Sequence, residues 1–316
     1  MRHIDVFNGD ADGICALHQL RMAEPVEAEL ITGVKHDIEL VKRVNAGSGD
    51  EVTVLDVSLE RNRAALLKLL DSGVHVRYFD HHAAPDIPVH PGLQAMINES
   101  ADICTSILVD RFLHGRFRIW AVVAAFGDNL ESAALGLAQS LKLDKNQQQA
   151  LRELGENLNY NAYGETESDL LIPPADLYLI VKRYADPFHL MRSESLLGRL
   201  GEERVSDMKQ ALKVAPQRVS GKSDAYILPD EPWSNRVSGT FANHLATADP
   251  ERAHAVITRT SRGYTISVRS PLEGGSTALG FCRQFATGGG RLHAAGINHL
   301  EPACLEEFLD RFEESF

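Results

Sequence analysis

The first half of the chain alternates short apolar runs with longer stretches in which apolar residues recur every three or four positions. Short runs of this kind are typical of buried strands, and the longer periodic stretches are typical of helices. The pattern predicts strands at 3–7, 28–32, 51–58, 74–80 and 94–99, and helices at 14–23, 37–47, 61–73 and 101–115. Strands that alternate with helices favour an α/β fold with a doubly wound, mostly parallel sheet.

The second half of the chain begins with helical periodicity and then returns to strands. Residues 131–215 have a helical pattern, and the polar stretch 191–217 is interpreted as a helical linker. Beyond it the pattern predicts a strand at 223–228, a hairpin at 253–270 that turns at Arg262-Gly263, and short helices at 236–246 and 278–286. We therefore expect an N-terminal domain at 1–190, a helical linker at 191–217 and a smaller C-terminal α/β domain at 218–316.

Composition narrows the class of protein. A chain of 316 residues with 44% hydrophobic and 24% charged residues fits a globular protein of two domains. The net charge of −12 argues against electrostatic binding along an extended stretch of duplex nucleic acid, which needs clustered lysine and arginine. The four cysteines are far apart, the N-terminus has no apolar signal core, and no apolar run could span a bilayer. We expect a cytoplasmic protein with no membrane partner.

Acidic and histidine residues follow several predicted strands at the point where each strand ends. Asp10 and Asp12 follow the first strand, Asp56 lies near the end of the third, and 80–82 (Asp-His-His) close the fourth. Asp128 follows the apolar run 119–127, which could be a strand or a buried helix. Because the carboxyl ends of parallel strands meet at one edge of a sheet, these groups are expected to lie close together.

Carboxylates at such close range repel one another unless some are protonated or a cation lies between them. Several aspartates with a histidine suit Mn²⁺ or Mg²⁺ better than tetrahedral zinc, which favours cysteine or several histidines. A central carboxylate can bridge two ions, an arrangement used on phosphate esters. Each motif alone has an ordinary alternative: Asp10, Asp12 and Asp56 could cap helices, and the His-His pair could be surface or packing residues.

Four motifs in this order resemble those of the DHH phosphoesterase superfamily: "DADG" (10–13), "VLDVS" (54–58), "FDHH" (79–82) and "FGDN" (126–129). In the C-terminal part, "YTISVRS" (264–270) and "TGGGRLHAAG" (287–296) are similar to the DHHA1 companion domain. The resemblance covers nearly the whole chain. It implies a catalytic site between the two domains, with metal on the first and substrate recognition on the second.

The resemblance also implies a role for individual residues. It implies two ions, Mn²⁺ or Mg²⁺, the first held by Asp10 and Asp56 and the second by Asp12, Asp56, His81 and Asp128. Asp80 is expected to orient a histidine ligand, and His82 to face the substrate and hydrogen-bond a phosphoryl oxygen. The substrate-binding residues that it implies are Arg269, Ser270, Gly288, Gly289, Gly290, Arg291 and His293.

The chain departs from the family pattern at both sites. Many members carry a histidine or a further aspartate just ahead of the paired aspartates, where this chain has Val6 and Asn8. The first metal position is therefore expected to be weaker or to rely on Asn8 and water. The glycine signature commonly continues with histidine, but here Arg291 follows the third glycine and His293 comes two residues later. The substrate pocket is expected to differ accordingly.

These observations predict a metal-dependent phosphoesterase that hydrolyses short oligonucleotides or nucleoside 3′,5′-bisphosphates with a metal-activated water. Cyclic dinucleotide phosphodiesterase and exopolyphosphatase-like activities are the alternatives within the superfamily. A non-catalytic nucleotide-binding regulatory protein is the alternative of another class, because Val6 and Asn8 could mean a lost metal. The expected partner is a short single-stranded oligonucleotide or small nucleotide rather than long duplex DNA. The oligomeric state stays open, with a homodimer as one option.

Overall fold

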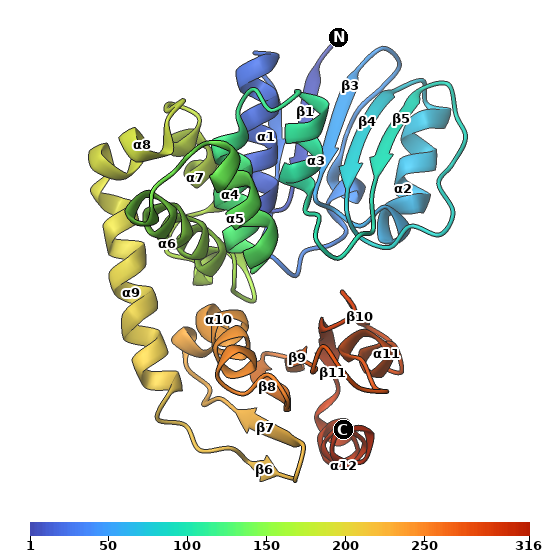
Figure 1. Cartoon of the computed structure of the whole chain (residues 1–316). Helices are drawn as coiled ribbons and strands as arrows, with labels where there is room; N and C mark the ends of the chain where they lie inside the picture. Colours follow the sequence, from blue (N-terminus) through green and yellow to red (C-terminus); the bar gives the residue numbers. More distant parts are fainter. The chain divides into compact units, whose positions relative to one another are not determined.

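The computed structural model describes residues 1–316 and divides the chain into two compact units, 1–201 and 202–316 (Figure 1). The boundary falls inside helix α9 (Ser195–Ala211), within the range in which a helical linker is expected. Each unit contains its own β-sheet and its own hydrophobic clusters.

The first unit is built on a five-stranded sheet in which every pair of neighbouring strands is parallel. Its strands are β1 (His3–Phe7), β2 (Glu29–Ile31), β3 (Glu51–Leu55), β4 (His75–Asp80) and β5 (Leu93–Ile97), in the order β2-β1-β3-β4-β5. Strands β1, β3 and β4 are thus direct neighbours, and their carboxyl ends meet at one edge. This arrangement confirms the predicted parallel α/β sheet.

Helices pack on both faces of this sheet, so it is doubly wound as predicted. One hydrophobic cluster joins β1, β3 and β4 to α1 (Ala11–Ala23), α3 (Thr105–Phe112) and α4 (Arg118–Gly127). A second cluster joins the opposite face to α2 (Leu59–Asp71) and the 3-10 turn η1 (Leu40–Arg43). Fully buried apolar side chains alternate between the two clusters along β1, as expected for a strand covered on both sides.

The rest of the first unit is helical, as its periodicity predicts. The elements are α5 (Glu131–Ser140), α6 (Lys145–Asn161), the short turn η2 (Glu167–Asp169), α7 (Pro174–Val181), α8 (Pro187–Ser193) and the beginning of α9. A capping box at Asp144 and Gln147 starts α6.

Two segments of this unit, 37–47 and 119–127, differ from their predicted structure or resolve an open alternative. The helix predicted at 37–47 is wrong, because only the single turn η1 forms. Two residues of this segment make other contacts. The Asp37 carboxylate pairs with Arg43, and the Val41 N–H donates to the Asn62 side chain at 3.2 Å. The ambiguous run 119–127 is helical and belongs to α4, so Asp128 is the residue that ends a helix rather than a strand.

The second unit is a six-stranded mixed sheet in the order β10-β11-β9-β8-β7-β6, with only β7 and β8 parallel. The strands are β6 (Arg218–Val219), β7 (Ser223–Ile227), β8 (Ala253–Thr260), β9 (Gly263–Arg269), β10 (Gly288–Gly290) and β11 (Ala294–Leu300). The helical elements are α10 (Pro232–Ala248), α11 (Ala278–Cys282), η3 (Pro302–Cys304) and α12 (Leu305–Ser315). This matches the predicted smaller α/β domain, although the β8–β9 hairpin turns one residue earlier, at Ser261-Arg262.

Candidate metal centre

The edge where β1, β3 and β4 end gathers the acidic and histidine residues of the first unit. Asp10 and Asp12 lie at the beginning of α1, Asp56 follows β3, and His81 follows β4. Each of these four residues is at least 92% buried, because their exposed fractions are 2%, 0%, 3% and 8%. The sequence prediction of a cluster at this edge is confirmed for these positions.

Asp10 and Asp12 are tolerated so close together because they face different partners. One oxygen of Asp10 accepts the N–H groups of Asp12 and Gly13, at 2.9 and 3.1 Å, and so caps α1. The two oxygens of Asp12 accept the N–H groups of Thr105 and Ser106, both at 2.7 Å, at the beginning of α3. The positive end of that helix favours the Asp12 carboxylate.

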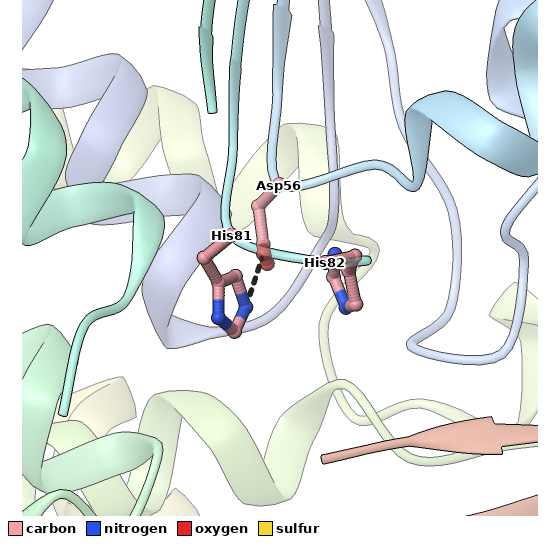
Figure 2. Close-up of side chains that lie close together, drawn as sticks. All are labelled: Asp56, His81 and His82. Atoms are coloured by element: carbon pink, nitrogen blue, oxygen red, sulfur yellow. Dashed lines mark ion pairs between the residues drawn. The ribbon is translucent and has the colours of Figure 1, made fainter. Parts of the chain in front are cut away.

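Asp56 and His81 form the centre of the cluster (Figure 2). His81 Nε2 lies 3.2 Å from Asp56 Oδ1 and 3.9 Å from Asp12 Oδ2. Asp56 adopts a left-handed backbone conformation, with φ of 58°. Such a conformation is uncommon outside glycine, although aspartate adopts it more readily than most residues, and it clusters at functional sites.

Two sets of potential ligand atoms lie within 4.8 Å of one another: Asp56, His81 and His82 form one, and Asp12, His81 and Asp128 form the other. The sets share His81. Together they include every residue assigned by resemblance to the second ion, but neither contains Asp10.

Asp80 acts on the second histidine rather than on the first. It is fully buried, and one of its oxygens lies 2.7 Å from His82 Nδ1. The same oxygen accepts the backbone N–H of His81 at 2.9 Å, and the other accepts the N–H of Leu59 at 3.2 Å. The ring that Asp80 orients is therefore that of His82, which is about a third exposed. Figure 2 shows this ring beside the Asp56–His81 pair but outside the ion pair between them.

The electrostatics of the cluster favour a bound cation. Burial, followed by the charges of Asp128 and Asp10, raises the pKa of Asp12 to about 7. Burial and the neighbouring Asp12 also raise the pKa of Asp56 well above its usual value. A divalent ion among these oxygens would remove the repulsion that raises both pKa values. The donor set of aspartates and one histidine fits Mn²⁺ or Mg²⁺.

Lys35 is a member of this cluster that sequence reasoning missed. Its ammonium forms an ion pair with Asp10, donates to Asn159 Oδ1 at 2.9 Å and lies 3.7 Å from Asp128 Oδ1. Burial lowers the pKa of Lys35, but the charges of Asp10, Tyr163 and Asp128 outweigh it and the pKa is raised. The sequence did contain one indication of this position. Lys35 comes shortly after the second strand, which ends at the same edge of the sheet as β1.

The predicted substrate residues of the second unit gather at one end of its sheet. Arg269 ends β9 opposite Ala294 of β11, and β10 is the edge strand beside β11. Ser270 Oγ lies 3.2 Å from His293 Nδ1. The Arg269 side chain donates to Asn243 Oδ1 of α10 at 2.8 Å, a partner that no sequence motif indicated. The glycines that could have formed a flexible turn are instead paired in a strand.

We expect Mn²⁺ to stabilise the protein more at pH 8 than at pH 5. Because the pKa of Asp12 is raised in the fold, metal-free protein loses stability as the pH rises from about 4 to about 7. Metal binding needs deprotonated ligands, so Mn²⁺ opposes this loss at high pH. At a free Mn²⁺ concentration of roughly 100 times Kd, the gain is about 2.7 kcal/mol, or about 5–10 °C in Tm.

Differential scanning fluorimetry with EDTA or MnCl₂ at both pH values measures this effect. Asp71→Asn is the matched control, because this exposed aspartate ends α2 next to the amino end of β4, at the opposite edge of the sheet. The control should show the wild-type shift. A Mn²⁺ shift of equal size at pH 5 and pH 8 would contradict the site.

Comparison with solved structures identifies the fold. The chain aligns over 99% of its length with a manganese-bound RecJ exonuclease, at a TM-score of 0.63 and 18% identity, covering 89% of that chain. It aligns with a pGpG-specific phosphodiesterase, PggH from Vibrio cholerae, at a TM-score of 0.54 and 13% identity, covering 98% of that chain. The chain has the DHH phosphoesterase fold.

Further comparisons agree with the DHH fold. RecJ from Thermus thermophilus with Mn²⁺ gives a TM-score of 0.65 at 18% identity. The alignment includes 99% of this chain and 51% of that RecJ, so this chain spans about half its length. No protein-family model matches the sequence, and no curated protein matches it. None of the helices of the chain is long and apolar enough to cross a membrane.

Proposed function

We propose that the chain is a divalent-metal-dependent phosphoesterase that hydrolyses short nucleotide phosphoesters, either short oligonucleotides or nucleoside 3′,5′-bisphosphates. The observation that carries the proposal is that two sets of potential ligand atoms, Asp56-His81-His82 and Asp12-His81-Asp128, meet at the shared His81 in a DHH fold. The solved structures with this fold include an exonuclease and a phosphodiesterase, which supports hydrolysis of a phosphoester.

In this proposal the four residues hold a divalent ion, Mn²⁺ or Mg²⁺. Such an ion lowers the pKa of a bound water and polarises a phosphoryl oxygen. The protein keeps the ligands in place through neighbouring groups. The beginning of α3 fixes Asp12 with two backbone hydrogen bonds, and Thr105 Oγ1 donates to Asp56 at 3.2 Å.

His82 is proposed to contact the substrate. Asp80 holds the ring through Nδ1, and Nε2 is the atom proposed to reach a phosphoryl oxygen. When both ring nitrogens carry a proton, the Nε2–H can donate to that oxygen and stabilise the negative charge that develops on it. The partial exposure of the ring fits a group that must reach a substrate.

The second unit is proposed to bind the phosphate and sugar of the nucleotide. Its contribution begins with Arg269, whose guanidinium is held by Asn243 Oδ1 at 2.8 Å and by the Val268 carbonyl at 3.0 Å. A guanidinium fixed in this way is proposed to bind an anion. The edge strand β10 adds backbone groups of glycine, and a Cβ at Gly289 would meet no atom within 4 Å. An anion could therefore approach this backbone closely. Arg291 directly follows the glycines and His293 lies two residues later, and both are proposed to contact the same phosphate.

The net charge of −12 favours a short substrate over a long polyanion, because a long strand needs an extended basic surface. The similarity to a pGpG-specific phosphodiesterase favours a linear dinucleotide as the particular oligonucleotide to test first. Cyclic dinucleotides and polyphosphate remain the competing substrates.

The test is hydrolysis by the purified chain with Mn²⁺ of four substrates: adenosine 3′,5′-bisphosphate, pGpG, a cyclic dinucleotide and polyphosphate. Products are separated by chromatography, and phosphate release is followed in parallel. We expect one of the first two to be cut with kcat/KM of about 10⁴ M⁻¹ s⁻¹ or more, and EDTA to abolish turnover. Binding of nucleotide without turnover of any substrate would support the regulatory alternative instead.

A further inference from the structure

Lys35 lies where a cation is expected. In the first unit its ammonium pairs with Asp10 and lies 3.7 Å from Asp128, so two carboxylates of the cluster share its one positive charge. It also donates to Asn159 of α6 at 2.9 Å, and the Tyr163 ring centroid is 5.5 Å away. Only 24% of the side chain is exposed. A lysine held in this way is a fixed point charge among acidic groups.

The backbone, and not only the side chain, places Lys35 at this point. The Lys35 N–H donates to the carbonyl of Ala162, just after α6, at 2.8 Å. The loop that carries Lys35 also lies directly against the β1–α1 turn, because a Cβ at Gly9 would be 2.3 Å from the Gly33 carbonyl oxygen. Glycine at position 9 permits this close approach. The loop that carries Lys35 therefore packs closely against the turn that carries Asp10.

The ligands implied for a first ion do not fit one. One oxygen of Asp10 caps α1, and the other accepts the Lys35 ammonium. Asp10 belongs to neither set of neighbouring ligand atoms. Val6, where many members of the superfamily have histidine, offers no ligand atom and is fully buried in the cluster beneath α2. By contrast, ligand atoms of Asp12, His81 and Asp128 do lie together, and Asp56 lies 3.2 Å from the shared His81.

We propose that the Lys35 ammonium replaces the first of the two cations, so that this chain binds a single divalent ion. Two of the three ammonium N–H groups serve Asp10 and Asn159. Asp128 Oδ1 lies 3.7 Å away, beyond hydrogen-bond distance, so the third N–H can reach a phosphoryl oxygen bound beside Asp128. The positive charge on that side of the centre is thus built into the protein. The inference rests on the metal site of the proposed function but not on the identity of the substrate.

The test counts Mn²⁺ ions per chain by equilibrium dialysis with elemental analysis, with electron paramagnetic resonance as a second readout. We expect about one ion in the wild type, with the spectrum of an isolated Mn²⁺ ion. Lys35→Met keeps the aliphatic stem but removes the charge, which frees Asp10. This variant should bind about two ions, with an exchange-coupled spectrum. Lys35→Arg, which keeps the charge, and Lys42→Met, which changes an exposed lysine, should each bind one.

Each other outcome counts against the proposal in a distinct way. Two ions in the wild type would overturn it, and so would a folded Lys35→Met protein that binds one ion with wild-type affinity. Lys35→Gln replaces Lys35→Met if circular dichroism shows that the latter is unfolded. No bound ion in the wild type would overturn both this proposal and the metal site. One ion without hydrolysis would contradict the proposed function alone.

Discussion

Asp56→Asn is expected to reduce phosphoester hydrolysis by more than about 100-fold, since loss even of an outer partner of a metal ligand costs 10–100-fold. Asp56 is 3% exposed, and its carboxylate lies 3.2 Å from His81 Nε2 at the centre of the cluster. The amide is nearly the same size, so the fold should persist. It carries no charge and offers one oxygen in place of two, so it binds a divalent ion poorly. We expect kcat and Mn²⁺ affinity to fall together.

The experiment combines steady-state kinetics with Mn²⁺ titration of the same preparation. Asp71→Asn serves again as the matched control, because it makes the same chemical change at an exposed residue on α2. It should keep wild-type kinetics. An Asp56→Asn protein with more than about a tenth of the wild-type kcat/KM would exclude a central role for this carboxylate.

The sequence predicted the parts of the site that depend on strand order alone. In a parallel sheet the residues after neighbouring strands meet at one edge, and this rule correctly brings together Asp10, Asp12, Asp56 and His81. The rule holds because each strand is a short apolar run with a sharp end. The motif that contains Asp128 was also found, although a helix and not a strand delivers it.

The sequence could not predict contacts that depend on how loops fold onto the sheet. Lys35 is 25 residues from Asp10 and 124 from Asn159, and no periodic pattern connects such positions. The wrong helix at 37–47 has the same origin. Its apolar spacing was locally helical, but the Val41 N–H donates to Asn62 of α2, a tertiary contact that competes with helix formation. Asn243 beside Arg269 was likewise hidden, because α10 and β9 meet only in the fold.

The roles of the two adjacent histidines can be separated because their rings have different partners. His81 Nε2 faces Asp56 and Asp12, whereas His82 Nδ1 is held by Asp80 at 2.7 Å. His82 also lies within ligand distance of Asp56 and His81, so it could alternatively bind metal. A substitution that keeps the Asp80 contact and removes only Nε2 distinguishes the two roles.

His82→Asn is such a substitution, because its amide can donate to Asp80 as Nδ1 does but does not extend to the position of Nε2. We expect kcat to fall about 10²–10³-fold, the usual cost of removing one donor that stabilises a developing oxyanion. Mn²⁺ affinity should stay within about threefold of the wild type, because the ion is held by other residues. His81→Asn, the matched change one residue earlier, should instead lose Mn²⁺ affinity by more than about 10-fold. If His82→Asn also loses Mn²⁺ affinity to that extent, His82 is a metal ligand and the phosphoryl oxygen must be bound by another donor.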